Sequence, residues 1–310
     1  MRLATFKADA ILLLAAAIWG AAFVAQRAAM QHLGPMGFNG IRFALGTLVL
    51  LPLIQARRTP ATAERATERR LYWRGGLLAG IVLFVGASLQ QAGLVYTTAG
   101  KAGFITGLYV VGVPILGLLI GQRTPALTWL GAGLAAVGLY LLSVSSRLEI
   151  NPGDGLVLAC AGVWAVHVLI IGRISPRTDP LCLAAVQFGV TAVLSLLAAA
   201  VFERITLTGI AAAKWAILYG GLCSVGIAYT LQVVGQRAAP PAHAAILLSF
   251  EAVFAALTGG WLLGEVLGPR ELLGCGLMLA GILVSQVRRA KPGRAESPPP
   301  EGATRRVSSD

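Results

Sequence analysis

The sequence predicts an all-α integral membrane protein in which ten transmembrane helices form two inverted five-helix repeats. Hydrophobic residues make up 56% of the 310-residue chain and charged residues only 12%, too few charges to cover a water-exposed surface. Apolar runs of about twenty residues follow one another between short polar breaks, and each is long enough to cross a bilayer. The chain also repeats itself at an offset of about 143 residues.

The apolar runs place the ten spans in order along the chain. We expect them near residues 9–31, 36–56, 71–95, 98–120, 125–145, 154–173, 180–202, 213–235, 242–263 and 270–288. These runs lack the alternation of a strand, and backbone groups in lipid must pair within helices or closed barrels, so each run indicates a helix. The Pro/Glu/Ser-rich segment 291–310 cannot bury apolar surface, and we expect it to be a disordered tail.

The repeat is carried by matched residues in the two halves. Asp9, Trp19, Pro35, Arg42 and Phe43 correspond to Asp154, Trp164, Pro180, Gln187 and Phe188, and Gln90 and Gly93 correspond to Gln232 and Gly235. Because five crossings are an odd number, the second half enters the membrane upside down. We therefore expect a first repeat at 1–148 and an inverted second repeat at 149–290, an architecture that is typical of secondary transporters.

The distribution of basic residues predicts which side of the membrane each end faces. Eighteen of the 25 lie on the side shared by both termini: Arg2, Lys7, Arg57, Arg58, Arg65, Arg69, Arg70, Arg74, Arg123, Arg173, Arg177, Arg237, Arg288, Arg289, Lys291, Arg294, Arg305 and Arg306. Six lie on the other side, and Arg42 lies inside a span. By the positive-inside rule both termini are cytoplasmic, and the net charge of +12 marks topology rather than a nucleic-acid surface. The expected location is the plasma (inner) membrane.

Two charged residues fall in the middle of spans, where insertion scales assign a cost of about 2.5–3.5 kcal/mol. Arg42 either snorkels or bonds to helix-end carbonyls, or it serves a gating or substrate role. Glu251 is a proton carrier, a ligand for a substrate amine, or a buried carboxylate bonded to a neighbouring helix.

Aromatic and amide side chains recur at related positions of the two halves. Trp19, Phe23 and Gln26 share one helical stripe, and Trp164, His167 and Ile171 share the stripe of the matching helix. We expect a central cavity between the repeats, because transporter sites lie near the midplane at that interface. Its predicted substrate-binding residues are Trp19, Gln90, Tyr109, Trp164, His167, Tyr229, Gln232 and Glu251.

Enzymatic and metal chemistry find little support in the sequence. The histidines at 32, 167 and 243 are scattered, and no HExxH or Gly-x-Ser-x-Gly pattern occurs. The four cysteines lack CxxC or Cys/His spacing, which is typical of small core residues rather than disulfides or metal ligands. We expect no catalytic residues, no metal and no cofactor.

Several motifs resemble those of a known family. They are Ile18-Trp19-Gly20 with Phe23, Arg42-Phe43, the segment 101–109 leading to Val113-Pro114, the segment 250–256, Gly264-Glu265, and the glycines Gly274 and Gly281. Residues 9–288 are thereby similar to the ten-helix EamA-type members of the drug/metabolite transporter superfamily. In that family a proline usually follows the acidic residue of the ninth helix, whereas this chain has Ala252 there. The resemblance therefore does not predict whether the ninth helix is kinked next to Glu251.

The resemblance implies a transporter working by alternating access, with the lipid bilayer and a small-molecule substrate as its partners. The favoured substrates are amino acids or related amphipathic metabolites, and export is the expected direction. Arg42 and Pro114 are expected to be gating or structural positions. The alternatives are a drug-like cation paired with Glu251 or, from another class, an intramembrane enzyme. Substrate identity, direction of transport, coupling ion and oligomeric state remain open at this point.

The predicted topology has a direct test. A phosphatase reporter, which is active only outside the cytoplasm, should be active when fused after Glu149 and inactive when fused in the tail. Activity in a fusion within the 57–70 loop would contradict the cytoplasmic assignment.

Overall fold

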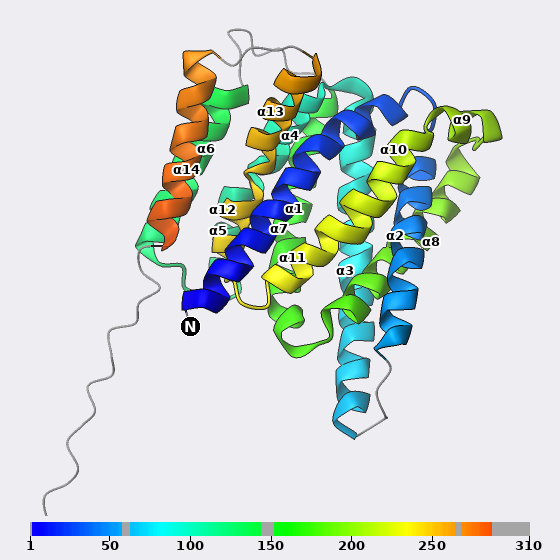
Figure 1. Ribbon diagram of the computed structural model, residues 1–310, viewed down its shortest axis with the longest axis horizontal. Helices are drawn as coiled ribbons and strands as arrows, with labels where there is room; N and C mark the ends of the chain where they lie inside the picture. The colour runs from blue at the N-terminus through cyan, green and yellow to red at the C-terminus, as the bar shows by residue number, and fades with distance from the viewer. Residues whose placement is uncertain (1, 58–62, 144–151, 264–267, 287–310) are drawn as a thin grey trace, which may run out of the picture.

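A computed structural model describes residues 2–57, 63–143, 152–263 and 268–286, and every regular element in these ranges is a helix (Figure 1). The all-α prediction is confirmed. The expected tail at 291–310 and the Gly264-Glu265 motif lie outside the described residues.

The first repeat supplies five spans, of which the fourth is divided. They are α1 (Arg2–Ala29), α2 (Pro35–Ala56), α3 (Ala63–Tyr96), α4 (Ala99–Gly107) continued by α5 (Tyr109–Leu119), and α6 (Ala126–Ser143). The N-terminus, the end of α2 and the start of α3 lie at the lower side of the bundle in Figure 1.

The second repeat follows the same order with more interruptions. Its elements are α7 (Pro152–Ile174) with the 3-10 turn η1 (Ser175–Arg177), α8 (Pro180–Phe202), the short α9 (Leu207–Ala212), α10 (Lys214–Leu218) continued by η2 (Tyr219–Tyr229) and α11 (Thr230–Gly235), α12 (Pro241–Leu248) continued by α13 (Glu251–Leu263), and α14 (Pro269–Gln286). Eight segments of the described chain are long and apolar enough to cross a membrane, and 126–142 forms a shorter apolar helix. Together with α14 they agree with the ten expected spans of a multi-pass membrane protein.

The fourth and ninth spans are broken at matching places. α5 begins at Tyr109 after a break at Leu108, and α13 begins at Glu251 after a break at Ser249 and Phe250. At the second break, the amide of Phe250 bonds to the carbonyl of Leu247, and the hydroxyl of Ser249 bonds to Ile246 O at 2.9 Å. The helix is thus interrupted next to Glu251, although Ala252 stands where the resemblance implies a proline, and the hydroxyl of Ser249 satisfies a carbonyl at the break.

Helices of the two repeats interleave rather than forming two separate bundles. α2 packs along α8, α3 lies against both α7 and α8, and α1 crosses α13 and η2. One carboxylate ties the halves together at a helix start: Glu203, just after α8, accepts hydrogen bonds from the amides of Met36 and Gly37 in the first turn of α2, at 2.8 and 2.7 Å. This contact satisfies amides that a helix start leaves unpaired.

The α6–α14 pair, at the edge of the bundle, is built on glycine (Figure 1). A Cβ atom added to Gly138 would lie 2.6 Å from the carbonyl oxygen of Gly274, and one added to Gly131 would lie 2.6 Å from that of Gly281. Such bare patches let helix backbones approach closely, which is how helices associate where no hydrophobic effect drives them together.

Replacing Gly138 with valine should therefore separate α6 from α14. We expect the free energy of unfolding to fall by about 1–3 kcal/mol, the usual cost of overpacking, measured by thermal denaturation in detergent. Gly133→Val is the matched control, because no atom lies within 4 Å of a Cβ at Gly133. Equal losses in both variants would contradict the close packing.

Candidate functional site

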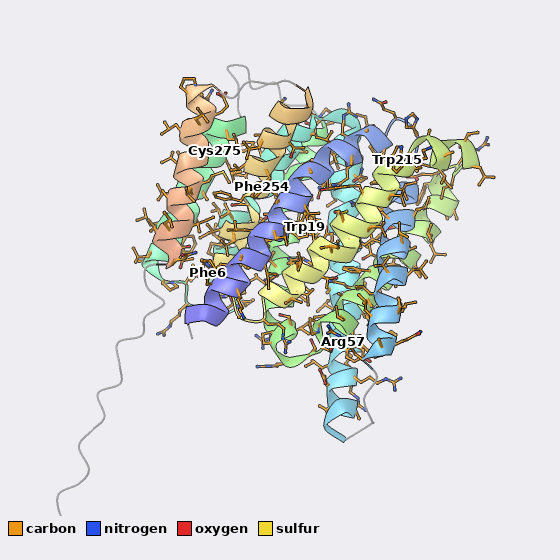
Figure 2. All side chains as sticks on the ribbon, in the orientation of Figure 1. Phe6, Trp19, Arg57, Trp215, Phe254 and Cys275 are labelled. Atoms are coloured by element: carbon orange, nitrogen blue, oxygen red, sulfur yellow. The ribbon has the colours of Figure 1, made fainter. Side chains whose placement is uncertain are left out.

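A cavity lies in the middle of the bundle, between the two repeats. The centre of a water molecule can occupy about 40 Å³ of it, which is room for a few waters. Its walls are Trp19, Phe23, Gln26, Arg42, Gln90, Thr106, Tyr109, Trp164, Val168, Ser224, Tyr229, Gln232, Leu248 and Glu251. Both halves of the chain contribute, and Figure 2 places Trp19 near the centre of the bundle on α1.

Tyr229 is the aromatic centre of this cavity. Its ring centroid lies 4.6 Å from that of Trp19 and 5.9 Å from that of Trp164. Behind it, the rings of Phe43 and Phe188 lie at 5.9 and 6.0 Å. Edge-to-face and tilted contacts at these distances are favourable, so the two repeat-related tryptophans are held against one shared ring.

Each of these tryptophans donates a hydrogen bond to the other repeat. Nε1 of Trp19 donates to the carbonyl of Ser224 at 3.2 Å, and Nε1 of Trp164 donates to Oε1 of Gln90 at 3.0 Å. Ser224 belongs to η2, where the wide π-helical turn replaces the regular α-helical pattern. Because the Gln90 oxygen is engaged, the amide NH₂ of Gln90 remains as the donor that this side chain offers to a solute.

Two opposite charges line the same cavity. Arg42 is 2% exposed. Its guanidinium donates from Nε to Oδ1 of Asn39 at 3.0 Å and lies 5.2 and 5.1 Å from the ring centroids of Phe38 and Phe43. The carboxylate of Glu251 is buried, and its Oε1 has no hydrogen-bond partner among the described residues. Within those residues, neither charge forms a salt bridge.

A buried charge without a partner is strongly unfavourable. The cavity also holds neutral polar groups: the hydroxyl of Thr106 and Oε1 of Gln232 have no hydrogen-bond partner among the described residues, and the hydroxyl of Tyr109 stands close to Glu251. The site therefore presents one acidic side chain, one basic side chain and several neutral polar atoms toward one small space. Such a set can bind a solute that carries both charges and some apolar surface.

The cavity brings together seven of the eight residues predicted from the sequence: Trp19, Gln90, Tyr109, Trp164, Tyr229, Gln232 and Glu251. His167 does not line it. Its ring lies 5.6 Å from that of Trp164, and Nε2 contacts Oε1 of Gln187 at 2.9 Å. Of the two gating or structural positions, Arg42 is in the wall, whereas Pro114 is buried in α5 away from it.

Some residues that line the cavity were not predicted from the sequence. Val168 and Leu248 are apolar residues in apolar helices, so their type gives no signal. Ser224 follows the glycines Gly220 and Gly221, which allow α2 to approach η2 closely. That glycine pair is a signal for close packing, but it does not indicate that a backbone carbonyl faces a tryptophan.

Comparison with known proteins identifies the family of the chain. The model of the EamA-like transporter family matches twice, over residues 6–144 and 151–286. The chain belongs to this family. The family places the protein in the drug/metabolite transporter superfamily and makes it a membrane transporter.

Individual relatives agree with this placement. An uncharacterized transporter of Archaeoglobus fulgidus is 32% identical over 288 residues, which are 91% of this chain and 86% of that protein. The threonine/homoserine exporter RhtA of Escherichia coli K12 is 28% identical over 286 residues, 89% of this chain and 90% of RhtA. A solved crystal structure with 20% identity superposes with a TM-score of 0.73 over 90% of this chain and 96% of its own, which shows that the two chains share a fold.

The Trp164–Gln90 bond gives a testable expectation for this EamA protein. Trp164→Phe leaves Oε1 of Gln90 with only the thiol of Cys160 at 3.8 Å. The free energy of unfolding should fall by about 1 kcal/mol, the usual size of a side-chain hydrogen bond between membrane helices, measured by denaturation in detergent. Trp215→Phe, at a site that is 73% exposed, is the control, and an equal loss there would contradict the role of the bond.

Proposed function

We propose that this protein exports small zwitterionic metabolites, in the first place neutral amino acids, from the cytoplasm by alternating access between its two inverted repeats. The observation that carries the proposal is the pair of buried, oppositely charged side chains, Arg42 and Glu251, that line one cavity without salt-bridge partners in the described chain. A relative that is 28% identical to this chain over 286 residues is named a threonine/homoserine exporter.

The zwitterion would satisfy both charges at once. Its ammonium group would bind the carboxylate of Glu251, and its carboxylate would bind the fork of the Arg42 guanidinium, a geometry suited to bidentate hydrogen bonds. The rings of Trp19 and Tyr229 would cover the side chain of the solute. Bonds to charged groups contribute about 1.5–3 kcal/mol each, enough to select a zwitterion over a neutral solute.

A drug-like cation is the second candidate, because Glu251 alone would bind it. It would leave the guanidinium of Arg42 buried beside a second positive charge, so we favour the zwitterion. Catalysis by an intramembrane enzyme would need a paired acid and base, and Glu251 is the single carboxylate among the cavity residues. We therefore propose that the protein is not an enzyme, and that it resides in the plasma membrane with both termini cytoplasmic.

Replacing Glu251 with glutamine should impair transport by weakening substrate binding. Losing a charge-assisted hydrogen bond of about 1.5–3 kcal/mol corresponds to a KM raised about 10- to 150-fold. The measurement is counterflow of labelled threonine and other neutral amino acids in proteoliposomes. Glu271→Gln, in the first turn of α14, is the matched control and should leave KM unchanged. A normal KM in Glu251→Gln would contradict this role.

The same vesicles test coupling, which we propose to be facilitated or only loosely linked to protons. An imposed pH gradient should not drive strong uphill accumulation in the wild type. If it does, and Glu251→Gln keeps downhill exchange at normal affinity while losing the accumulation, then Glu251 is a coupling residue and the proposal is wrong. Absence of flux for every amino acid tested, with flux of organic cations, would favour the second candidate.

A further inference from the structure

An acidic residue near the start of the first helix of each repeat meets a basic residue of the other repeat. Asp9 on α1 and Asp154 on α7 are matched positions of the sequence repeat. Their partners are matched as well, because Lys101 is the third residue of α4 and His243 is the third residue of α12. The duplication has thus kept an acid–base pair twice, although the basic side chain differs between the two copies.

The first pair joins α1 of the first repeat to α12 of the second. Nε2 of His243 lies 3.0 Å from Oδ1 of Asp9, and both side chains are buried, with 3% and 9% exposed. Nδ1 of His243 lies 2.9 Å from Oγ of Ser285, and Nε2 of Gln286 donates to Oδ2 of Asp9 at 3.3 Å. The second repeat therefore holds Asp9 through two helices, α12 and α14.

The second pair joins α7 of the second repeat to the first. Nζ of Lys101 lies 3.8 Å from Oδ2 of Asp154, and the side chains are 33% and 12% exposed. The hydroxyl of Thr97, between α3 and α4, donates to Oδ1 of Asp154 at 2.6 Å. This pair is longer and more exposed than the first, so it is the weaker connection.

The two pairs lie at opposite ends of the bundle. α1 starts at the side where the N-terminus lies in Figure 1, whereas α7 starts after five crossings, at the other side. The cavity with Trp19 and Trp164 lies further along these same two helices, between the pairs. The repeats are therefore joined by one acid–base contact on each side of the cavity.

We propose that Asp9–His243 and Lys101–Asp154 are the two gate contacts of the transport cycle, each holding the repeats together at one membrane face and each released in turn. A rocking motion that opens one face must separate the repeats there while keeping them joined at the other face. The proposal rests on the alternating access proposed above, and it does not depend on the identity of the solute. The weaker Lys101–Asp154 pair is the more readily opened.

Side-specific labelling of the cavity tests this assignment. A single cysteine replaces Val168, a buried apolar wall residue, in a chain whose four native cysteines are alanine. A membrane-impermeant methanethiosulfonate reagent is then applied to right-side-out and to inside-out vesicles. Asp154→Asn should raise the labelling rate from one face, and Asp9→Asn should raise it from the opposite face, each by about fivefold or more.

Exchanged pairs separate a gate from a merely stabilising contact. Lys101→Asp combined with Asp154→Lys, and Asp9→His combined with His243→Asp, should return the rates toward those of the parent chain. Asp179→Asn is the matched control: its side chain caps α8 within one repeat, and asparagine caps equally well, so its rates should stay unchanged from both faces.

The outcomes are distinct. Faster labelling from opposite faces, with rescue by the exchanged pairs, supports the gate contacts. If the same protein transports none of the amino acids tested, the proposed substrate is wrong but the gate contacts still stand. Faster labelling from both faces in each variant means that the pairs only stabilise the fold and overturns the proposal. Unchanged rates in both aspartate variants overturn it as well.

Discussion

The burial of opposite charges inside an apolar bundle is the constraint on which this structure depends. Arg42 is kept in place by Asn39 and by the faces of Phe38 and Phe43, and Glu251 stands at the first turn of α13, where the helix has just been interrupted. Both arrangements cost free energy that the apolar packing around them must offset. Because both side chains line a cavity, a bound ligand of opposite charge can supply the partners that they lack.

Each repeat completes hydrogen bonds of the other. Trp19 of the first repeat needs the carbonyl of Ser224 in the second, and Trp164 of the second needs Gln90 in the first. Glu203 likewise completes the start of α2 from across the sequence. In the assembled bundle, each half thus satisfies polar groups of the other.

The sequence was sufficient for the spans, for the repeat and for half of the residues that line the cavity, because hydropathy and matched residues such as Trp19 and Trp164 act over whole helices. His167 lies outside the cavity wall, since a helical stripe predicts a shared face but not which edge of that face turns to a neighbouring helix, here toward Gln187. Nor could the sequence place η2, whose wide turns depend on contacts such as Val225 against Gly46. Local pattern does not encode such packing.

Divergence between the matched positions of the two repeats has one further consequence. The counterpart of Arg42 is Gln187, which faces His167, and Glu251, which opens α13, stands where the first repeat opens α5 with Tyr109. Two identical half-length subunits would carry either charge twice, or neither, around the central axis. A diverged chain has one positive and one negative pole, and this polarity would fix the head-to-tail orientation of a bound solute. With the rings of Trp19 and Tyr229 as a third contact for the side chain of the solute, the site would distinguish mirror-image molecules.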